Sequence, residues 1–88
     1  MDNWKENETE LELTLQFKDF KTAWAFMNEV AIVAEEQHHH PTWTNTYNTV
    51  DIELSTHDEG NVVTDYDYKL AASINTILEK YEYEHTNS

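Results

Sequence analysis

Four histidines in two segments of the chain could carry out acid–base chemistry. Residues 38–40 are all histidine and precede Pro41, and His57 follows in the short polar segment 55–58. Histidine is the side chain whose unperturbed pKa lies nearest neutrality, so two rings around one substrate can deliver one proton and remove another. Clustering them is costly, because neighbouring imidazolium ions repel each other. The pattern therefore indicates a site that uses these rings.

A metal centre is the rival interpretation of the same rings. His39, His40 and His57 could supply three imidazoles to zinc. Neighbouring residues rarely bind one ion, however, and the sequence has no cysteine and no His-Glu-x-x-His spacing. We therefore expect neither a metal nor another cofactor. His85 has no motif around it and is expected to take no part.

Longer motifs include the histidines and extend over most of the chain. They are Phe17-Lys18-Asp19-Phe20, Val30-Ala31, Glu35 with His39-His40-Pro41-x-Trp43, Tyr47-Asn48-x-Val50, Leu54-Ser55-Thr56-His57 and Thr64-x-x-Asp67-x-x-Leu70-Ala71. Over roughly residues 4–78 these motifs resemble one enzyme family, the pterin-4a-carbinolamine dehydratases.

The resemblance implies a reaction and a partner. Members of this family remove water from a 4a-hydroxytetrahydropterin, giving a quinonoid dihydropterin, in the recycling of tetrahydrobiopterin. Such a dehydration needs a proton delivered to the departing hydroxyl and a proton removed from the ring system, while a ring nitrogen lone pair expels the leaving group. It needs no metal, redox cofactor or covalent nucleophile. The implied partner is a small-molecule pterin.

Site roles carry over by position in the motif. His39 and His57 correspond to the acid–base pair, and His40 joins the catalytic set mainly as a pterin-binding group. Substrate-binding roles fall on five further residues, Glu35, Pro41, Trp43, Thr56 and Asp67.

Local chemistry adds to these assignments. Glu35 lies one helical turn before His39 and is placed to orient an imidazole. Pro41 and Trp43 are expected to wall the pocket, where a flat ring offers stacking contact. His38 stands where many relatives have an acid or an asparagine, and on an extended segment its ring would point to the other face. We therefore expect His38 to be a bystander.

The loop after His57 departs from the family pattern. It is one residue longer before Thr64 than in the animal proteins, which leaves the placement of Asp67 to be tested. Asp67 also has a local role, because it lies three residues after Thr64 and can reach back to it in a variant of the capping box.

The elements that position these residues follow from apolar periodicity. Alternation of apolar and polar side chains predicts half-buried strands at residues 11–17 and 50–54, with shorter strands at 4–6 and 43–47. A first helix is expected from the Asp19 N-cap until residues 35–41 end it, and a second from Thr64 to about Lys80. This order predicts an α+β two-layer domain, in which a four-stranded antiparallel sheet carries both helices on one face.

Length and charge bound the protein further. Eighty-eight residues make one domain, which we place at 1–80, followed by a polar C-terminal tail at 81–88 that is expected to fray. Five Lys and Arg against eighteen Asp and Glu give a net charge of −13, so binding to nucleic acid or to an anionic membrane is not expected. No signal peptide or membrane-spanning stretch is evident, and a cytoplasmic location is expected.

The first helix is apolar on two sides, which predicts self-association. Phe26 and Val33 lie on a line separate from the stripe expected to face the sheet, and we predict that they pack against a second subunit in a homodimer or homotetramer. That stripe comprises Phe20, Ala23, Met27, Val30, Ala31 and Ala34. Animal members of the resembled family are also dimerisation cofactors of a homeodomain transcription factor, so a non-enzymatic interaction module is the alternative function. An intact histidine set favours the enzyme.

Overall fold

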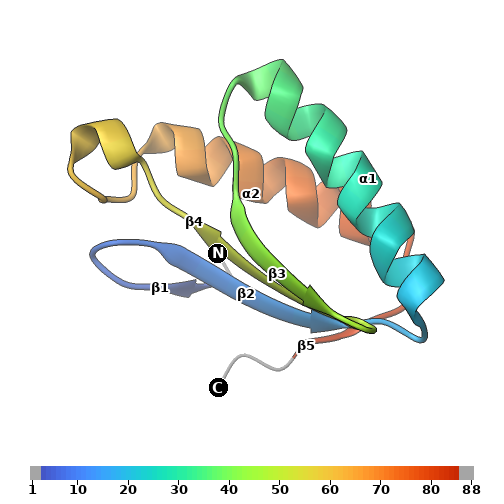
Figure 1. Ribbon diagram of the computed structural model, residues 1–88. Helices are drawn as coiled ribbons and strands as arrows, with labels where there is room; N and C mark the ends of the chain where they lie inside the picture. Colours follow the sequence, from blue (N-terminus) through green and yellow to red (C-terminus); the bar gives the residue numbers. More distant parts are fainter. Residues whose placement is uncertain (1–2, 86–88) are drawn as a thin grey trace.

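The computed structural model describes residues 3–85 and places two helices over one face of an antiparallel sheet (Figure 1). The α+β class is therefore confirmed. In chain order the elements are β1 (Lys5–Glu6), β2 (Leu11–Gln16), α1 (Phe20–Gln37), β3 (Thr42–Thr46), β4 (Thr49–Leu54), the one-turn 3-10 helix η1 (His57–Glu59), α2 (Asp65–Leu78) and β5 (Glu84–His85).

The sheet has the order β1-β2-β4-β3, with β5 as a fifth strand that the sequence did not predict. The two-residue strands β1 and β5 pair with the same edge of β2, at opposite ends of that strand. Lys5 of β1 lies opposite Glu12, and His85 of β5 lies opposite Leu15. The expectation of a fraying tail is therefore wrong for residues 81–85, where Tyr81 and Tyr83 also pack against the core. Residues 86–88 of the predicted tail lie outside the described part of the chain.

The core lies between the sheet and the helices. Leu11, Leu13 and Leu15 of β2 are fully buried, as the alternating pattern predicts. The antiparallel register sets Leu13 opposite Ile52 of β4, so both strands turn the same face inward. Removing each such side chain from water stabilises the fold by about 1.5–3 kcal/mol. The opposite face of the sheet is left to polar side chains.

Helix α1 is rotated from the orientation that the sequence suggested. Phe26, which we expected at a subunit interface, is fully buried, and its ring lies 5.0 Å from that of Phe17. Phe20 and Ala31, which we expected against the sheet, are exposed. The two apolar lines of α1 have the same period, so only the packing of α1 against α2 and the sheet decides which one is covered. The side chains buried in α1 are Ala23, Phe26, Met27, Val30 and Ala34.

Both ends of α1 are closed by local hydrogen bonds. At its start Oδ1 of Asp19 accepts from the backbone N–H of Thr22 at 2.8 Å, which confirms the predicted N-cap. At its end His38 takes a left-handed conformation with φ of 53°, and the N–H of His39 donates to the carbonyl of Ala34 at 3.1 Å. The chain therefore turns sharply at His38, and this residue is not extended as expected.

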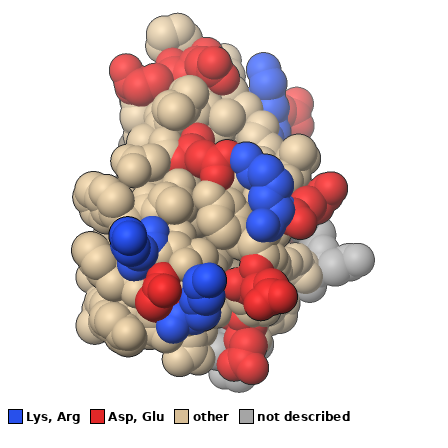
Figure 2. Space-filling view, turned by 90° about the vertical axis from the view of Figure 1, so that its right-hand side faces the viewer, with Lys and Arg blue, Asp and Glu red and all other residues tan. Residues whose placement is uncertain are grey.

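Charge is unevenly spread over the surface. Figure 2 views the side of the molecule that lies at the right of Figure 1, and there Lys side chains stand among Asp and Glu. Lys18 and Lys80 border one hollow together with Glu82. The net charge of −13 therefore does not make every face uniformly acidic. Within residues 3–85, no helix has both the length and the apolar character needed to cross a bilayer.

Candidate functional site

The two histidine segments meet at one pocket of about 190 Å³. One wall comes from the turn that ends α1, and the other from the chain that leaves β4. The residues that line the pocket are His38, His39, His40, Ser55, Thr56, His57 and Asp58. The fold thus brings together segments that are separated by the whole β3–β4 hairpin.

His39 is held by a buried carboxylate. Its Nε2 donates to Oδ1 of Asp67 at 2.6 Å, and Asp67 is fully buried while 13% of the His39 side chain is exposed. The other oxygen of Asp67, Oδ2, accepts from Oγ1 of Thr56 at 2.8 Å and from the backbone N–H of Thr64 at 2.9 Å. The buried carboxylate is therefore satisfied by three donors, as such groups must be. Nδ1 of His39 is left as the nitrogen that can meet a ligand.

This arrangement settles where Asp67 lies and what it contacts. The bond to the Thr64 N–H is the predicted reach back to the start of α2, and the loop after His57 does not displace it. Thr56, which we expected to bind substrate, is itself buried and donates to Asp67. Its contacts make it a support for the carboxylate. Thr56 Oγ1 also lies 2.6 Å from Oγ1 of Thr64, so the end of β4 and the start of α2 share one polar network.

His40 pairs with Glu35 across the end of α1. Nε2 of His40 lies 2.5 Å from Oε2 of Glu35, and both side chains are largely exposed. The hydrogen bond from His40 holds the pKa of Glu35 below its ordinary value. The imidazole oriented by Glu35 is therefore that of His40, although Glu35 also lies one turn before His39.

His57 borders two hollows. Its Nδ1 lies 2.6 Å from Oδ1 of Asn61, a residue that the sequence reasoning did not single out. His57 and Ser55 also border a second hollow of about 390 Å³. The remaining residues of that hollow are Thr9, Glu10, Thr42, Glu53 and Asn61.

Three other expectations differ from the observed geometry. Pro41 and Trp43 do not line the pocket of the histidines, and Trp43 instead packs against the hydrophobic core. His38 does line it, because the left-handed turn at this residue carries the chain around the end of α1. Tyr66 was not foreseen either, and its exposed ring stacks on that of His39 with centroids 5.7 Å apart.

The described side chains also bear on the metal interpretation. Among residues 3–85, the group of three that could hold an ion is Glu10, Glu12 and Glu53, and no histidine belongs to it. Burial and the neighbouring Glu12 raise the pKa of Glu10. The histidine pocket is lined by four imidazole rings, and Nε2 of His39 and Nε2 of His40 each face a carboxylate of the protein.

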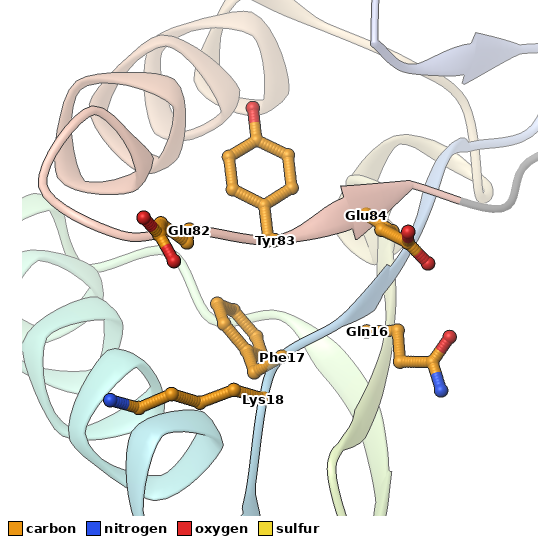
Figure 3. Close-up of a pocket in the computed structure, with 6 residues that line it drawn as sticks. All are labelled: Gln16, Phe17, Lys18, Glu82, Tyr83 and Glu84. Carbon is orange, nitrogen blue, oxygen red and sulfur yellow. The ribbon is translucent and has the colours of Figure 1, made fainter.

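Another hollow, of about 340 Å³, lies where β5 meets the end of β2. Figure 3 shows the rings of Phe17 and Tyr83 in its centre. The polar ends of Lys18 and Glu82 lie to one side of Phe17 and those of Gln16 and Glu84 to the other. The histidine pocket is the better candidate for acid–base chemistry, because four histidines line it.

Comparison with known proteins places the chain in a family. A family model described as pterin 4 alpha carbinolamine dehydratase matches residues 1–77. A protein of Synechococcus sp. (strain WH7803), named as a candidate pterin-4-alpha-carbinolamine dehydratase, is 48% identical over 75 residues, which cover 85% of this chain and 80% of the relative. A protein of Brucella ovis with the same name is 44% identical over 79 residues, covering 88% and 80% of the two chains.

Solved structures agree with these relatives. A crystal structure from Brucella melitensis, titled transcriptional coactivator/pterin dehydratase, superposes with a TM-score of 0.82 at 43% identity and covers 88% of this chain and 83% of the other. A pterin dehydratase-like protein described as a RuBisCO assembly factor of the alpha-carboxysome shares the fold, with a TM-score of 0.67 at 20% identity over 84% of each chain. Sequence, fold and the convergence of the two histidine segments point the same way, and the chain belongs to the pterin-4a-carbinolamine dehydratase family.

Proposed function

We propose that this protein is a 4a-hydroxytetrahydrobiopterin dehydratase that works by histidine general acid–base catalysis in tetrahydrobiopterin recycling. The observation that carries the proposal is the His39–Asp67 pair at the pocket that also holds His57. A ring that is oriented by a buried carboxylate and a second ring across the same pocket supply the two proton-transfer groups that the reaction needs.

The division of work follows from which ring nitrogens are already engaged. Asp67 occupies Nε2 of His39, which leaves Nδ1 for the substrate. The Asp67 carboxylate also stabilises the imidazolium that forms when His39 accepts a proton. Asn61 occupies Nδ1 of His57, which leaves Nε2 of this ring for the substrate. One ring protonates the departing 4a-hydroxyl, and the other accepts a proton from the pterin ring system as water leaves.

His40 and Glu35 are proposed to bind the pterin. Their pair lies at the exposed rim of the pocket, where its remaining donors and acceptors can meet the polar edge of a pterin. The supporting roles of Thr56 and Asp67 are proposed to be indirect, through the position of His39. Pro41 and Trp43 are not proposed to contact the substrate.

The test is a dehydratase assay with enzymatically generated 4a-hydroxytetrahydropterin. Wild type is expected to be active, and His39→Ala and His57→Ala are each expected to lose at least about tenfold in turnover while remaining folded. His85→Ala is the matched control, because His85 is exposed in β5 and outside the pocket. Near-normal turnover in both pocket variants would contradict the proposal.

We also propose that the protein is a homodimer or homotetramer that associates through an exposed part of α1 different from the one first expected. Phe20 and Trp24 are 47% and 51% exposed, and their rings stack with centroids 6.2 Å apart. Exposed apolar patches of this kind mark interaction sites. Lys18 and Lys21 flank the pair, so two acidic subunits would repel each other least there.

The same surface favours the second candidate function, a non-enzymatic interaction module. The Brucella melitensis protein is described as both a transcriptional coactivator and a pterin dehydratase. The two functions are separable in this chain, because the stacked pair lies at the start of α1 and the histidines at its end. A variant without Phe20 and Trp24 that no longer associates but keeps its dehydratase activity would show that this surface serves association and not catalysis. A cytoplasmic location remains a prediction.

A further inference from the structure

Asn61 closes the loop that begins at His57. The side-chain Oδ1 of Asn61 lies 2.6 Å from Nδ1 of His57. Both Gly60 and Asn61 have left-handed backbones, with φ of 84° and 60°. Their N–H groups donate to the carbonyls of His57 at 3.0 Å and Thr56 at 3.1 Å. The loop therefore turns back on itself, and the amide at its end reaches the ring at its start.

The loop is anchored to the polar network under the pocket. The N–H of Thr56 donates to the carbonyl of Val62 at 2.9 Å, which pairs the two ends of the loop. The side chain of Thr56 is fixed in turn by Asp67. Asn61 thus stands on a backbone that is tied to the same network as His39, and its position relative to His57 is set by the fold.

The left-handed backbone accounts only partly for an asparagine at this place. Asparagine tolerates positive φ better than most residues, but glycine adopts it at no steric cost. A glycine would leave the His57 ring without its neighbour. The contact with Nδ1 is therefore a feature of the side chain and not of the backbone requirement.

The chemistry of the contact selects one form of the imidazole. An amide oxygen only accepts hydrogen bonds, so the neutral His57 ring must carry its hydrogen on Nδ1. Nε2 then bears the lone pair. At His39 the order is reversed, because Asp67 accepts from Nε2. The two rings thus use opposite nitrogens for these hydrogen bonds and leave opposite nitrogens for a ligand.

We propose that Asn61 is a positioning residue that holds neutral His57 in the Nδ1–H tautomer, so that Nε2 exchanges the proton with the substrate. The kinetic part of this inference rests on the proposed dehydratase function, whereas the tautomer does not. The experiments below separate the two.

The first experiment reads the tautomer directly. The full chain is labelled with 15N-histidine, and the ring 15N shifts of His57 are recorded in wild type, Asn61→Gly and Asn61→Asp. Wild type is expected to carry the hydrogen on Nδ1, Asn61→Gly to shift toward the Nε2–H form, and Asn61→Asp to keep Nδ1–H because a carboxylate also accepts. Glycine keeps the left-handed backbone, so the variant is expected to fold. An Nε2–H form in wild type, or no change in Asn61→Gly, overturns the proposal.

The second experiment measures turnover. Asn61→Gly is expected to lose roughly fivefold in kcat, the worth of one hydrogen bond, with little change in KM. Asn61→Asp is expected to restore kcat and to move the pH–rate profile to higher pH, because a carboxylate favours the imidazolium. Glu10, Glu53 and Asp58 border the same hollows, but they are unchanged in every variant. A shift of the pH–rate profile in Asn61→Asp is therefore caused by the change at position 61.

A matched control removes loop flexibility as an explanation. Glu59→Gly makes the same loop more flexible without touching the His57 ring, and it is expected to keep wild-type kcat. An equal loss in Glu59→Gly and Asn61→Gly would overturn the positioning role. If the tautomer shifts in Asn61→Gly but His57→Ala is fully active, the proposed function is wrong, whereas the role of Asn61 in setting the His57 tautomer is supported. If His57→Ala is inactive and the tautomer does not respond, only the role of Asn61 fails.

Discussion

Asp67 accepts a hydrogen bond from Nε2 of His39 at 2.6 Å, while its other carboxylate oxygen accepts from the backbone N–H of Thr64, the N-cap of α2. One buried side chain therefore caps a helix and orients a ring of the candidate site. Because the carboxylate is fully buried, it meets little competition from water, and the pair is stronger than the exposed pair of His40 with Glu35.

The double role of Asp67 gives the first prediction. Asp67→Asn keeps the shape of the side chain but removes its charge, and we expect kcat to fall about tenfold or more because the imidazolium of His39 is no longer stabilised. Asp19→Asn is the matched control, since Asp19 also caps a helix with its carboxylate but lies outside the pocket. Steady-state kinetics and thermal melting are compared for both. Equal losses of kcat in the two variants would make the effect one of helix capping.

Glu35 provides a prediction about substrate affinity. Glu35→Gln removes the carboxylate that holds His40, and because both side chains are exposed the effect should be modest. We expect KM to rise about twofold to fivefold with kcat nearly unchanged. Glu36→Gln, on the next residue of the same helix, should leave KM as it is. A fall in kcat as large as that of His39→Ala would instead place His40 in the proton transfer.

Activity is expected to survive removal of metal ions. The proposed dehydration is redox-neutral, and within residues 3–85 the group of three side chains placed to hold an ion includes no histidine. Turnover should therefore be the same before and after dialysis against a chelator, with residual zinc measured in the same samples. Loss of turnover that zinc restores would favour the metal-binding interpretation.

A stability prediction concerns the contact between the C-terminal segment and α1. The hydroxyl of Tyr81 and the ammonium of Lys80 both donate to the carboxylate of Glu29. The hydrogen bond to Glu29 raises the pKa of Tyr81 from 10.0 to about 12. Tyr81→Phe should lower the free energy of unfolding by about 1 kcal/mol at neutral pH. Tyr47→Phe, on an exposed tyrosine, should not.

The same tyrosine gives the pH dependence of that difference. Because the pKa of Tyr81 is higher in the folded state than the ordinary 10.0, the folded protein binds the proton more tightly than the unfolded chain. The advantage of wild type over Tyr81→Phe should be complete below pH 10 and disappear as the pH rises toward about 12. Denaturant titrations across this window measure it, and an advantage that persists unchanged at the top of the window would refute the assignment.

The last prediction concerns association through α1. Phe20→Asp with Trp24→Asp should give smaller, folded particles, because charges buried at a subunit contact without partners are strongly unfavourable. Both residues are exposed in the single chain, so folding should survive the change. Tyr47→Asp, at another exposed aromatic, is the control. Light scattering gives the masses, and an unchanged mass in the double variant would place the association surface elsewhere.

The sequence by itself predicted the two helices, the four strands β1 to β4 and the residues of the candidate site. The strands at β2 and β4 follow from side chains that alternate every second residue, and the caps at Asp19 and Asp67 follow from bonds to amides three residues away. The histidine set was evident from the motif. All these features depend on neighbours along the chain, so a local pattern suffices to predict them.

Only the tertiary structure decided which side chains and strands contact each other. It buried Phe26, left Phe20 exposed, paired β5 with β2 and brought Asp67 to His39. The two apolar lines of α1 are equivalent in period, and the pairing of β5 joins segments at opposite ends of the chain. Such choices depend on which surfaces meet when the whole chain is packed, because burial is a property of the assembled core and not of any one segment.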